Sequence, residues 1–186
     1  AHREAFSTIW ENRAIFQKQD AAVADLALAM MNVVVDHNLV EYEEIASQSY
    51  IDALNESVWQ ADRQFILDEA ERITPLLTSA DQREWEKRIR KRDPTLAYAV
   101  RAYWLGHDPT PTTALNERLI DHWQRIKFAR EHYARHKLPP YETDDRGVIY
   151  VKYGKPDRAR TIALGTNTME MMRWIELADF GDGCLL

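Results

Sequence analysis

Residues 21–40 read AAVADLALAMMNVVVDHNLV and form the most apolar stretch of the chain. Apolar residues recur in this stretch at steps of three and four, which is the spacing of an amphipathic helix. Asp25, Asp36 and His37 interrupt it, so it differs from the charge-free run of about 20 residues that spans a membrane. We therefore expect residues 20–37 to form a buried helix of a helical bundle, with no membrane span in this chain.

Helical spacing continues on both sides of this stretch, and strong helix breakers are missing from the first 74 residues. Proline first occurs at Pro75 and glycine at Gly106. Both residue types disfavour helix interiors, so their absence favours long helices. Ser79 with Gln82 has the spacing of a capping box and marks a helix start. The pattern predicts further helices near residues 3–18, 40–55, 57–77, 79–92, 94–104 and 113–136.

The last part of the chain has a different character. Residues 147–153 read GVIYVKY, a run rich in β-branched and aromatic residues with glycine at its start and just after its end, and this predicts a strand. Residues 160–164 and 169–175 could supply two more strands. The predicted fold class is α+β, with a mainly helical N-terminal two-thirds and a small antiparallel β-sheet at the C-terminal end. We also expect residues 141–157 to dock on the helix over 113–136.

Charge divides the chain near residue 80. Residues 1–80 contain 5 Lys/Arg and 14 Asp/Glu, whereas residues 81–186 contain 19 and 16. We expect a helical region over 1–77, with room for helix-pair repeats, and a second domain over 78–186. The small sheet needs more cover than its own domain offers, so we expect either a longer native chain or a neighbouring subunit.

Two segments together resemble a known family. The first reads YWLGHDPTPT over residues 103–112 and is followed by Asn-Glu at 116–117. The second reads YETDDRGVIYVKYGKPD over residues 141–157. In this order and spacing they resemble the GWxTD-domain family of bacterial proteins, over about residues 76–175.

The resemblance implies a module of envelope-associated or exported bacterial proteins, and it supplies no catalytic residue. It implies a location in the periplasm, the cell envelope or outside the cell, and the sequence leaves a cytoplasmic location open. Other protein subunits are the implied partners, with peripheral association with the envelope as a further expectation. Pro140, Tyr141 and His107 stand where the family pattern has Gly, Trp and Arg.

Our candidates for interaction all lie in the two matched segments. They are Trp104, Asp108, Pro109, Asn116, Glu117, Tyr141, Thr143, Asp144, Arg146, Gly147, Tyr150, Lys152, Gly154 and Pro156.

Three carboxylates are the weak candidates for catalysis: Asp108, Asp144 and Asp145. Paired carboxylates can act as general acid and base. Asp-Asp-Arg-Gly is also ordinary turn chemistry, in which Asp accepts hydrogen bonds from backbone N–H groups. An envelope-polymer hydrolase is therefore the alternative function, and a carboxylate pair within about 10 Å would favour it.

Other motifs argue against metal, nucleotide and nucleic-acid chemistry. His132 and His136 are four residues apart but lack the Glu of a zinc-protease helix. Gly-Lys-Pro-Asp at 154–157 lacks the glycines and the Ser or Thr of a phosphate loop. Glutamates interrupt the basic run over 83–92, and the chain is acidic overall, with a net charge of -6. A lone cysteine, Cys184, excludes an internal disulfide. We expect no cofactor, no metal and no nucleic-acid partner.

A non-catalytic structural or protein-interaction module is the function that the sequence favours, as a subunit or segment of an extracytoplasmic bacterial assembly. The alternatives are the hydrolase above and a helical peptide-binding module. The latter needs a concave groove formed by residues 1–77.

Overall fold

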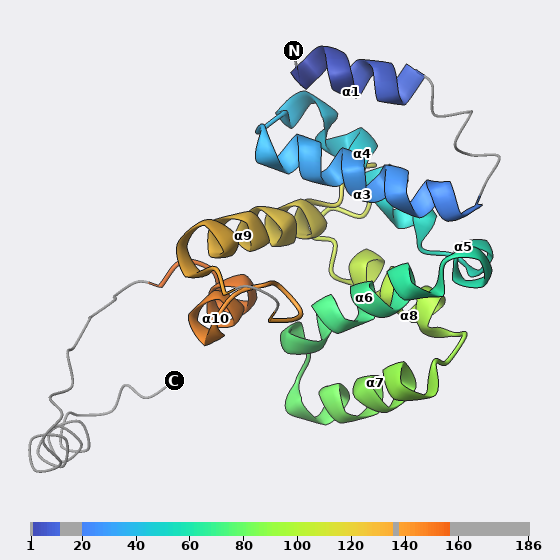
Figure 1. Ribbon diagram of the computed structural model, residues 1–186, viewed down its shortest axis with the longest axis vertical. Coiled ribbons are helices and arrows are strands. Elements are labelled where there is room, and N and C mark those ends of the chain that lie inside the picture. The colour runs from blue at the N-terminus through green and yellow to red at the C-terminus, as the bar shows by residue number, and fades with distance from the viewer. Residues whose placement is uncertain (1, 12–19, 136–137, 157–186) are drawn as a thin grey trace, which may run out of the picture. The chain divides into compact units, whose positions relative to one another are not determined.

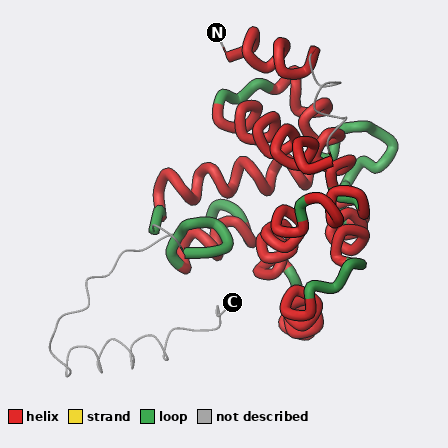
Figure 2. Tube along the Cα trace, turned by 45° about the vertical axis from the view of Figure 1, so that its right-hand side comes forward, coloured by secondary structure: helices red, strands yellow, loops and turns green. Residues whose placement is uncertain are grey.

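The computed structural model describes residues 2–11, 20–135 and 138–156, and helices account for most of them (Figure 1). Within these ranges there is no β-strand, and a single isolated antiparallel bridge joins Ala134 to Thr143 (Figure 2). The expected helical character is confirmed. The elements in chain order are α1 (His2–Glu11), α3 (Asp20–Asp36), η1 (Val40–Tyr42), α4 (Glu43–Ala53), α5 (Glu56–Ala61), α6 (Arg63–Ile73), η2 (Thr74–Leu76), α7 (Ser79–Lys91), α8 (Leu96–Gly106), α9 (Glu117–Tyr133) and α10 (Asp145–Tyr153).

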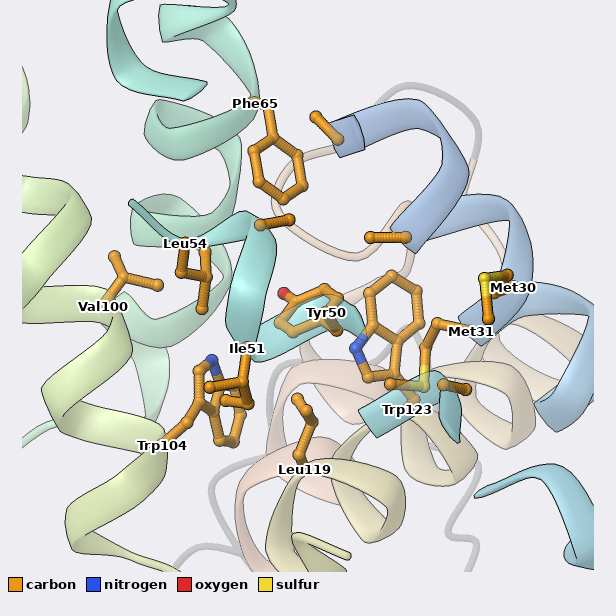
Figure 3. Close-up of a cluster of buried hydrophobic side chains, with 14 of the residues drawn as sticks. Met30, Met31, Tyr50, Ile51, Leu54, Phe65, Val100, Trp104, Leu119 and Trp123 are labelled. Atoms are coloured by element: carbon orange, nitrogen blue, oxygen red, sulfur yellow. The ribbon is translucent and has the colours of Figure 1, made fainter. Parts of the chain in front are cut away.

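Helix α3 contains most of the apolar stretch over residues 21–40, and it packs against α4, α5 and α9. Its buried side chains recur at helical spacing and include Met30, Met31 and Val34. Tyr50 of α4 and Trp123 of α9 meet edge to face beside it, with ring centroids 5.9 Å apart (Figure 3). None of the described helices has both the length and the apolar character needed to cross a bilayer.

One hydrophobic core joins residues from both sides of position 77. It includes Ile66 of α6 together with Trp104 of α8 and Leu119 of α9. A second, smaller cluster lies between α9 and the segment that follows it, and it contains Ile126, Ala129, Tyr141 and Val151.

The single helix predicted over 57–77 is instead three elements, α5, α6 and η2. The break between α5 and α6 falls at Asp62, which caps α6, while Asn55 caps the start of α5. The Asn55 side chain accepts a hydrogen bond from the Val58 N–H at 3.0 Å, and the Asp62 side chain accepts one from the Phe65 N–H at 3.2 Å.

Helix α7 begins as predicted, but Thr78 caps it and the proposed Ser79–Gln82 capping box does not. The Thr78 hydroxyl accepts from the Asp81 N–H at 3.3 Å and donates to the Asp81 carboxylate at 2.6 Å. The helix ends at Arg92, whose φ of 50° lies in the left-handed region.

The strand predicted over residues 147–153 is wrong, since these residues form α10. Asp144 caps the helix by accepting from the N–H groups of Arg146 and Gly147 at 3.0 and 3.4 Å. Gly154 follows the helix with a positive φ of 83°, which suits a helix C-terminus. The β-branched residues of this segment therefore follow the capping residues rather than their own strand propensity. The strands predicted over 160–164 and 169–175 lie outside the described residues.

The expected docking of this segment on the preceding helix is confirmed for residues 141–153, though as a helix. α10 packs on α9 and on η2. Tyr150 stacks on Phe128 of α9 with ring centroids 4.3 Å apart, and the Lys152 ammonium donates to the Leu77 carbonyl at 3.1 Å. Ile149 and Tyr153, one turn apart, are exposed by 58% and 72%.

Candidate protein-interaction site

Tyr141 and Thr143 of the second matched segment are buried. The Tyr141 hydroxyl donates to the backbone carbonyl of Arg72 in α6, which ties the segment to that helix. Burial raises the pKa of the Tyr141 phenol, so it stays protonated. Thr143 packs against Gly147, where a Cβ would lie 2.3 Å from the threonine Oγ1. Only glycine fits there without a shift of the threonine. Both residues hold the fold together.

Asp144 and Arg146 form a local pair at the start of α10. Two N–H groups of the helix and the Arg146 guanidinium, at 2.6 Å, all donate to the Asp144 carboxylate. These bonds favour the ionised form and lower the pKa of Asp144. A general acid needs a raised pKa, so this environment does not suit Asp144 to the acid role in the hydrolase alternative. Asp145 is exposed in the first turn of α10.

The first matched segment forms a turn between α8 and α9. The Asp108 carboxylate accepts from the Thr110 N–H at 3.0 Å, and Glu117 accepts from the Thr110 hydroxyl. The hydrogen bond from the Thr110 hydroxyl lowers the pKa of Glu117. Pro109 is exposed in this turn. The carboxylates here stabilise the backbone of the turn.

Asn116 joins three helices. Its side chain caps α9 by accepting from the Leu119 N–H at 2.9 Å and donates to the Trp104 carbonyl of α8 at 2.8 Å. Its own N–H donates to the Ser47 hydroxyl of α4 at 3.0 Å. Trp104 is itself buried in the core. These two candidates are therefore structural.

The end of α10 is held by Arg125 of α9. Its guanidinium lies against Gly154 and 3.5 Å from the carbonyls of Val151 and Lys152, where a helix C-terminus carries partial negative charge. Pro156 is exposed just beyond. Polar groups of the two matched segments thus bond to the protein's own backbone.

Two adjoining hollows lie elsewhere, between α6, η2, α7 and the segment before Tyr141. Their volumes are about 390 and 230 Å³, and they share Glu71, Pro139 and Pro140. We call them together the acidic groove. Its remaining lining residues are Asp68, Arg72, Thr74, Pro75, Glu86, Ile89, Arg90 and Glu142. Asp108, Asp144 and Asp145 do not line it.

The walls of the acidic groove are held in place by bonds between distant segments. The Tyr141 hydroxyl ties the Pro139–Pro140 wall to α6 through the Arg72 carbonyl. The Trp85 indole N–H of α7 donates to the Ala70 carbonyl of α6 at 2.8 Å. Both bonds join parts of this chain to one another, so they hold the walls in place without a contribution from a ligand.

Among the described residues that line the acidic groove, four are carboxylates and two are cations. Asp68 accepts from the neutral Gln64 amide at 2.6 Å, so its charge is not compensated there. Glu71 has no ion pair within the described residues, and burial together with the neighbouring Asp68 raises its pKa. The groove carries uncompensated negative charge beside Pro75, Ile89 and the two prolines.

The described residues that line the acidic groove include carboxylates, arginines, prolines, a threonine and an isoleucine, and no Ser, Cys or His is among them. Within the described ranges, no group of three or more His, Cys, Asp or Glu side chains is placed to hold a metal ion. The groove combines residues near 70, 90 and 140, so no single stretch of the sequence indicates it.

Comparison of the chain with protein-family models, with curated proteins and with solved structures found no match. The resemblance to the GWxTD-domain family therefore stays a prediction, carried by the two matched segments.

Proposed function

We propose that this chain is a non-catalytic protein-interaction module and that the acidic groove holds a segment of a partner protein. The observation that carries the proposal is the contrast between two sets of carboxylates. Asp108 and Asp144, both in the matched segments, accept bonds from the chain's own backbone. Those of the groove, above all Glu71, stand beside apolar side chains at a hollow of ligand size.

The groove also supports the peptide-binding alternative in a changed form. Residues 1–77 contribute one wall, from Asp68 to Pro75, while α7 and residues 139–142 contribute the others. The resemblance to exported bacterial modules supports a place in an extracytoplasmic assembly, as a subunit or segment. The partner is then another protein of the periplasm, the cell envelope or the cell exterior.

Site-specific photo-cross-linking in the bacterium that makes the protein tests this proposal. Arg90 lines the groove with a side chain exposed by 70%, so a photoreactive amino acid fits there without disturbing the core. Tyr98 of α8, exposed by 55% and outside the groove, is the matched control position. We expect a discrete adduct with one other protein from position 90 and none from position 98.

Fractionation of the same cells locates both the protein and its adduct. Recovery from the periplasmic or envelope fraction is the expected result. Equal labelling from both positions, or no adduct from position 90, would contradict the groove as the contact site.

A further inference from the structure

We infer that the acidic groove recognises a basic side chain, arginine or lysine, that adjoins an apolar residue in the partner segment. This inference rests on the proposed function and adds the chemistry of the partner. It follows from the way charge and apolar surface are divided between the two hollows.

The smaller hollow supplies the negative charge. Asp68, Glu71 and Glu142 line it, and Arg72 is the one cation among its described lining residues. The Arg72 guanidinium pairs with the buried Glu69 and lies over the Trp123 ring, 5.3 Å from its centroid. Arg72 also interacts electrostatically with Asp68 and Glu142 and so offsets part of their charge, whereas Glu71 has no ion pair within the described residues.

Two of these carboxylates repel each other. Asp68 and Glu71 are three residues apart on α6, a spacing that places side chains on the same face of a helix. Burial is the larger cause of the raised pKa of Glu71, and the charge of Asp68 adds to it. A guanidinium or ammonium entering the hollow would be attracted by both charges at once.

The negative charge of Glu142 adds to that of the other carboxylates in the hollow, because its ion pair neutralises it only in part. Its carboxylate lies 3.6 Å from the Arg130 Nε, a loose pair whose glutamate side chain is 65% exposed. At the far end of the groove, Arg90 lies 3.8 Å from Glu86, and both side chains are largely exposed. Such pairs open readily, because exposed ion pairs contribute little free energy.

The larger hollow supplies the apolar contact. Pro75, Ile89, Pro139 and Pro140 line it, and its volume of about 390 Å³ has room for a large aliphatic or aromatic side chain. Prolines have little conformational freedom to lose on binding, and the walls are already held by the Tyr141 and Trp85 bonds. A partner segment would thus place an apolar residue here and its basic neighbour beside Glu71.

Selection from a random library of displayed dodecapeptides on the full chain tests this chemistry. We expect the enriched peptides to share an Arg or Lys next to an aliphatic or aromatic residue. Replacing that Arg by citrulline, which keeps its shape and removes its charge, should weaken binding about tenfold, and rising salt should weaken the parent peptide.

Matched variants of the protein test whether the peptide binds at the acidic groove. Glu71→Gln should weaken the enriched peptide about tenfold, since it removes one of the attracting charges. Glu84→Gln on α7, whose side chain is 64% exposed and does not line the groove, should leave binding unchanged. Circular dichroism of both variants confirms that each is folded.

The outcomes separate this inference from the proposed function. Absence of enrichment, enrichment without a basic residue, or equal binding of the arginine and citrulline peptides overturns the inference, while a cross-linked partner at position 90 would keep the groove as an interaction site. Basic peptides that bind through Glu71, with no adduct in cells, would uphold the chemistry and refute the proposed function.

Discussion

Helices α7 and α9 are both amphipathic and both rich in charge, yet they are held in different ways. α9 buries six side chains along its length: Leu119, Ile120, His122, Trp123, Ile126 and Ala129. α7 has no fully buried residue and packs on α6 and η2 through half-buried Trp85 and Ile89. One helix is part of the core, and the other is a wall of the acidic groove. The difference shows that a helix can be strongly predicted by sequence and still be free to serve binding.

Replacing one tryptophan on each helix should give the largest difference in stability between changes in α9 and in α7. Trp123→Ala removes a side chain that is 3% exposed and contacts both Tyr50 and Arg72, so we expect a loss of about 3–5 kcal/mol in the free energy of unfolding. Trp85→Ala on α7 should lose about 1–2 kcal/mol, because that ring is only half buried. Urea denaturation measures both, and equal losses would contradict the distinction between the two helices.

The second prediction concerns a buried histidine of α9. His122 is 1% exposed between Trp104 and Tyr141, with ring centroids 5.0 and 5.8 Å away. Burial, with Arg118, Arg72 and Arg125 nearby, lowers its pKa from 6.5 to about 3. The folded state thus binds this proton less readily than the unfolded state, so stability should fall as the pH drops below about 6.5. The expected loss is about 2 kcal/mol at pH 5.

His122→Leu isolates this contribution. Neither ring nitrogen has a hydrogen-bond partner within the described residues, so leucine removes the titration without breaking a bond. Buried Glu69 has a raised pKa and acts in the opposite direction, but it is present in both proteins. We expect the variant to lose less stability than the wild type between pH 7 and pH 5 in urea titrations. Parallel pH curves would show that His122 does not titrate as described.

The packing of α10 below α9 gives a smaller effect. Gly147→Ala places a methyl group against Thr143, and we expect a loss of about 1–2 kcal/mol because the strain exceeds the helix preference of alanine. Adding Thr143→Ala removes the clashing atoms and should recover part of the loss. A double-mutant cycle from thermal unfolding tests this coupling. Additive losses would mean that the two residues do not contact each other.

The smallest expected effect concerns α7, which forms one wall of the acidic groove. Trp85→Phe keeps a ring but removes the N–H that donates to the Ala70 carbonyl, so we expect a loss of about 1 kcal/mol. Hydrogen exchange should become faster in α7 and stay unchanged in α9. Uniform acceleration in both helices would show that α7 belongs to the same cooperative unit as the core.

The helices up to α9 could be predicted because two signals agree there. Apolar periodicity and the lack of glycine and proline both favour helix, and the structure follows them even where Asp62 divides one predicted helix into α5 and α6. Residues 147–153 were harder, because their β-branched residues suit a strand while Asp144 and Gly154 are helix boundary signals. In the structure the boundary residues decide.

The acidic groove could not have been predicted in the same way. Its charges come from α6, α7 and Glu142, and only the folded chain brings these segments together. Neither α6 nor α7 signals by itself which of its many charges lacks a partner. The matched segments misled for the opposite reason, since polar residues such as Asn116 and Asp144 looked available but bond to the backbone.

Asn116 also has a consequence for how the chain folds. Its contacts with Ser47 and with Trp104 close loops of very different length, since one partner is 69 residues away and the other 12. Closing the longer loop loses more chain entropy and lowers the folding rate of topologies that depend on it. Both bonds need the first turn of α9 to lie beside α4 and α8 at once, so this asparagine links a local helix cap to a contact between distant segments.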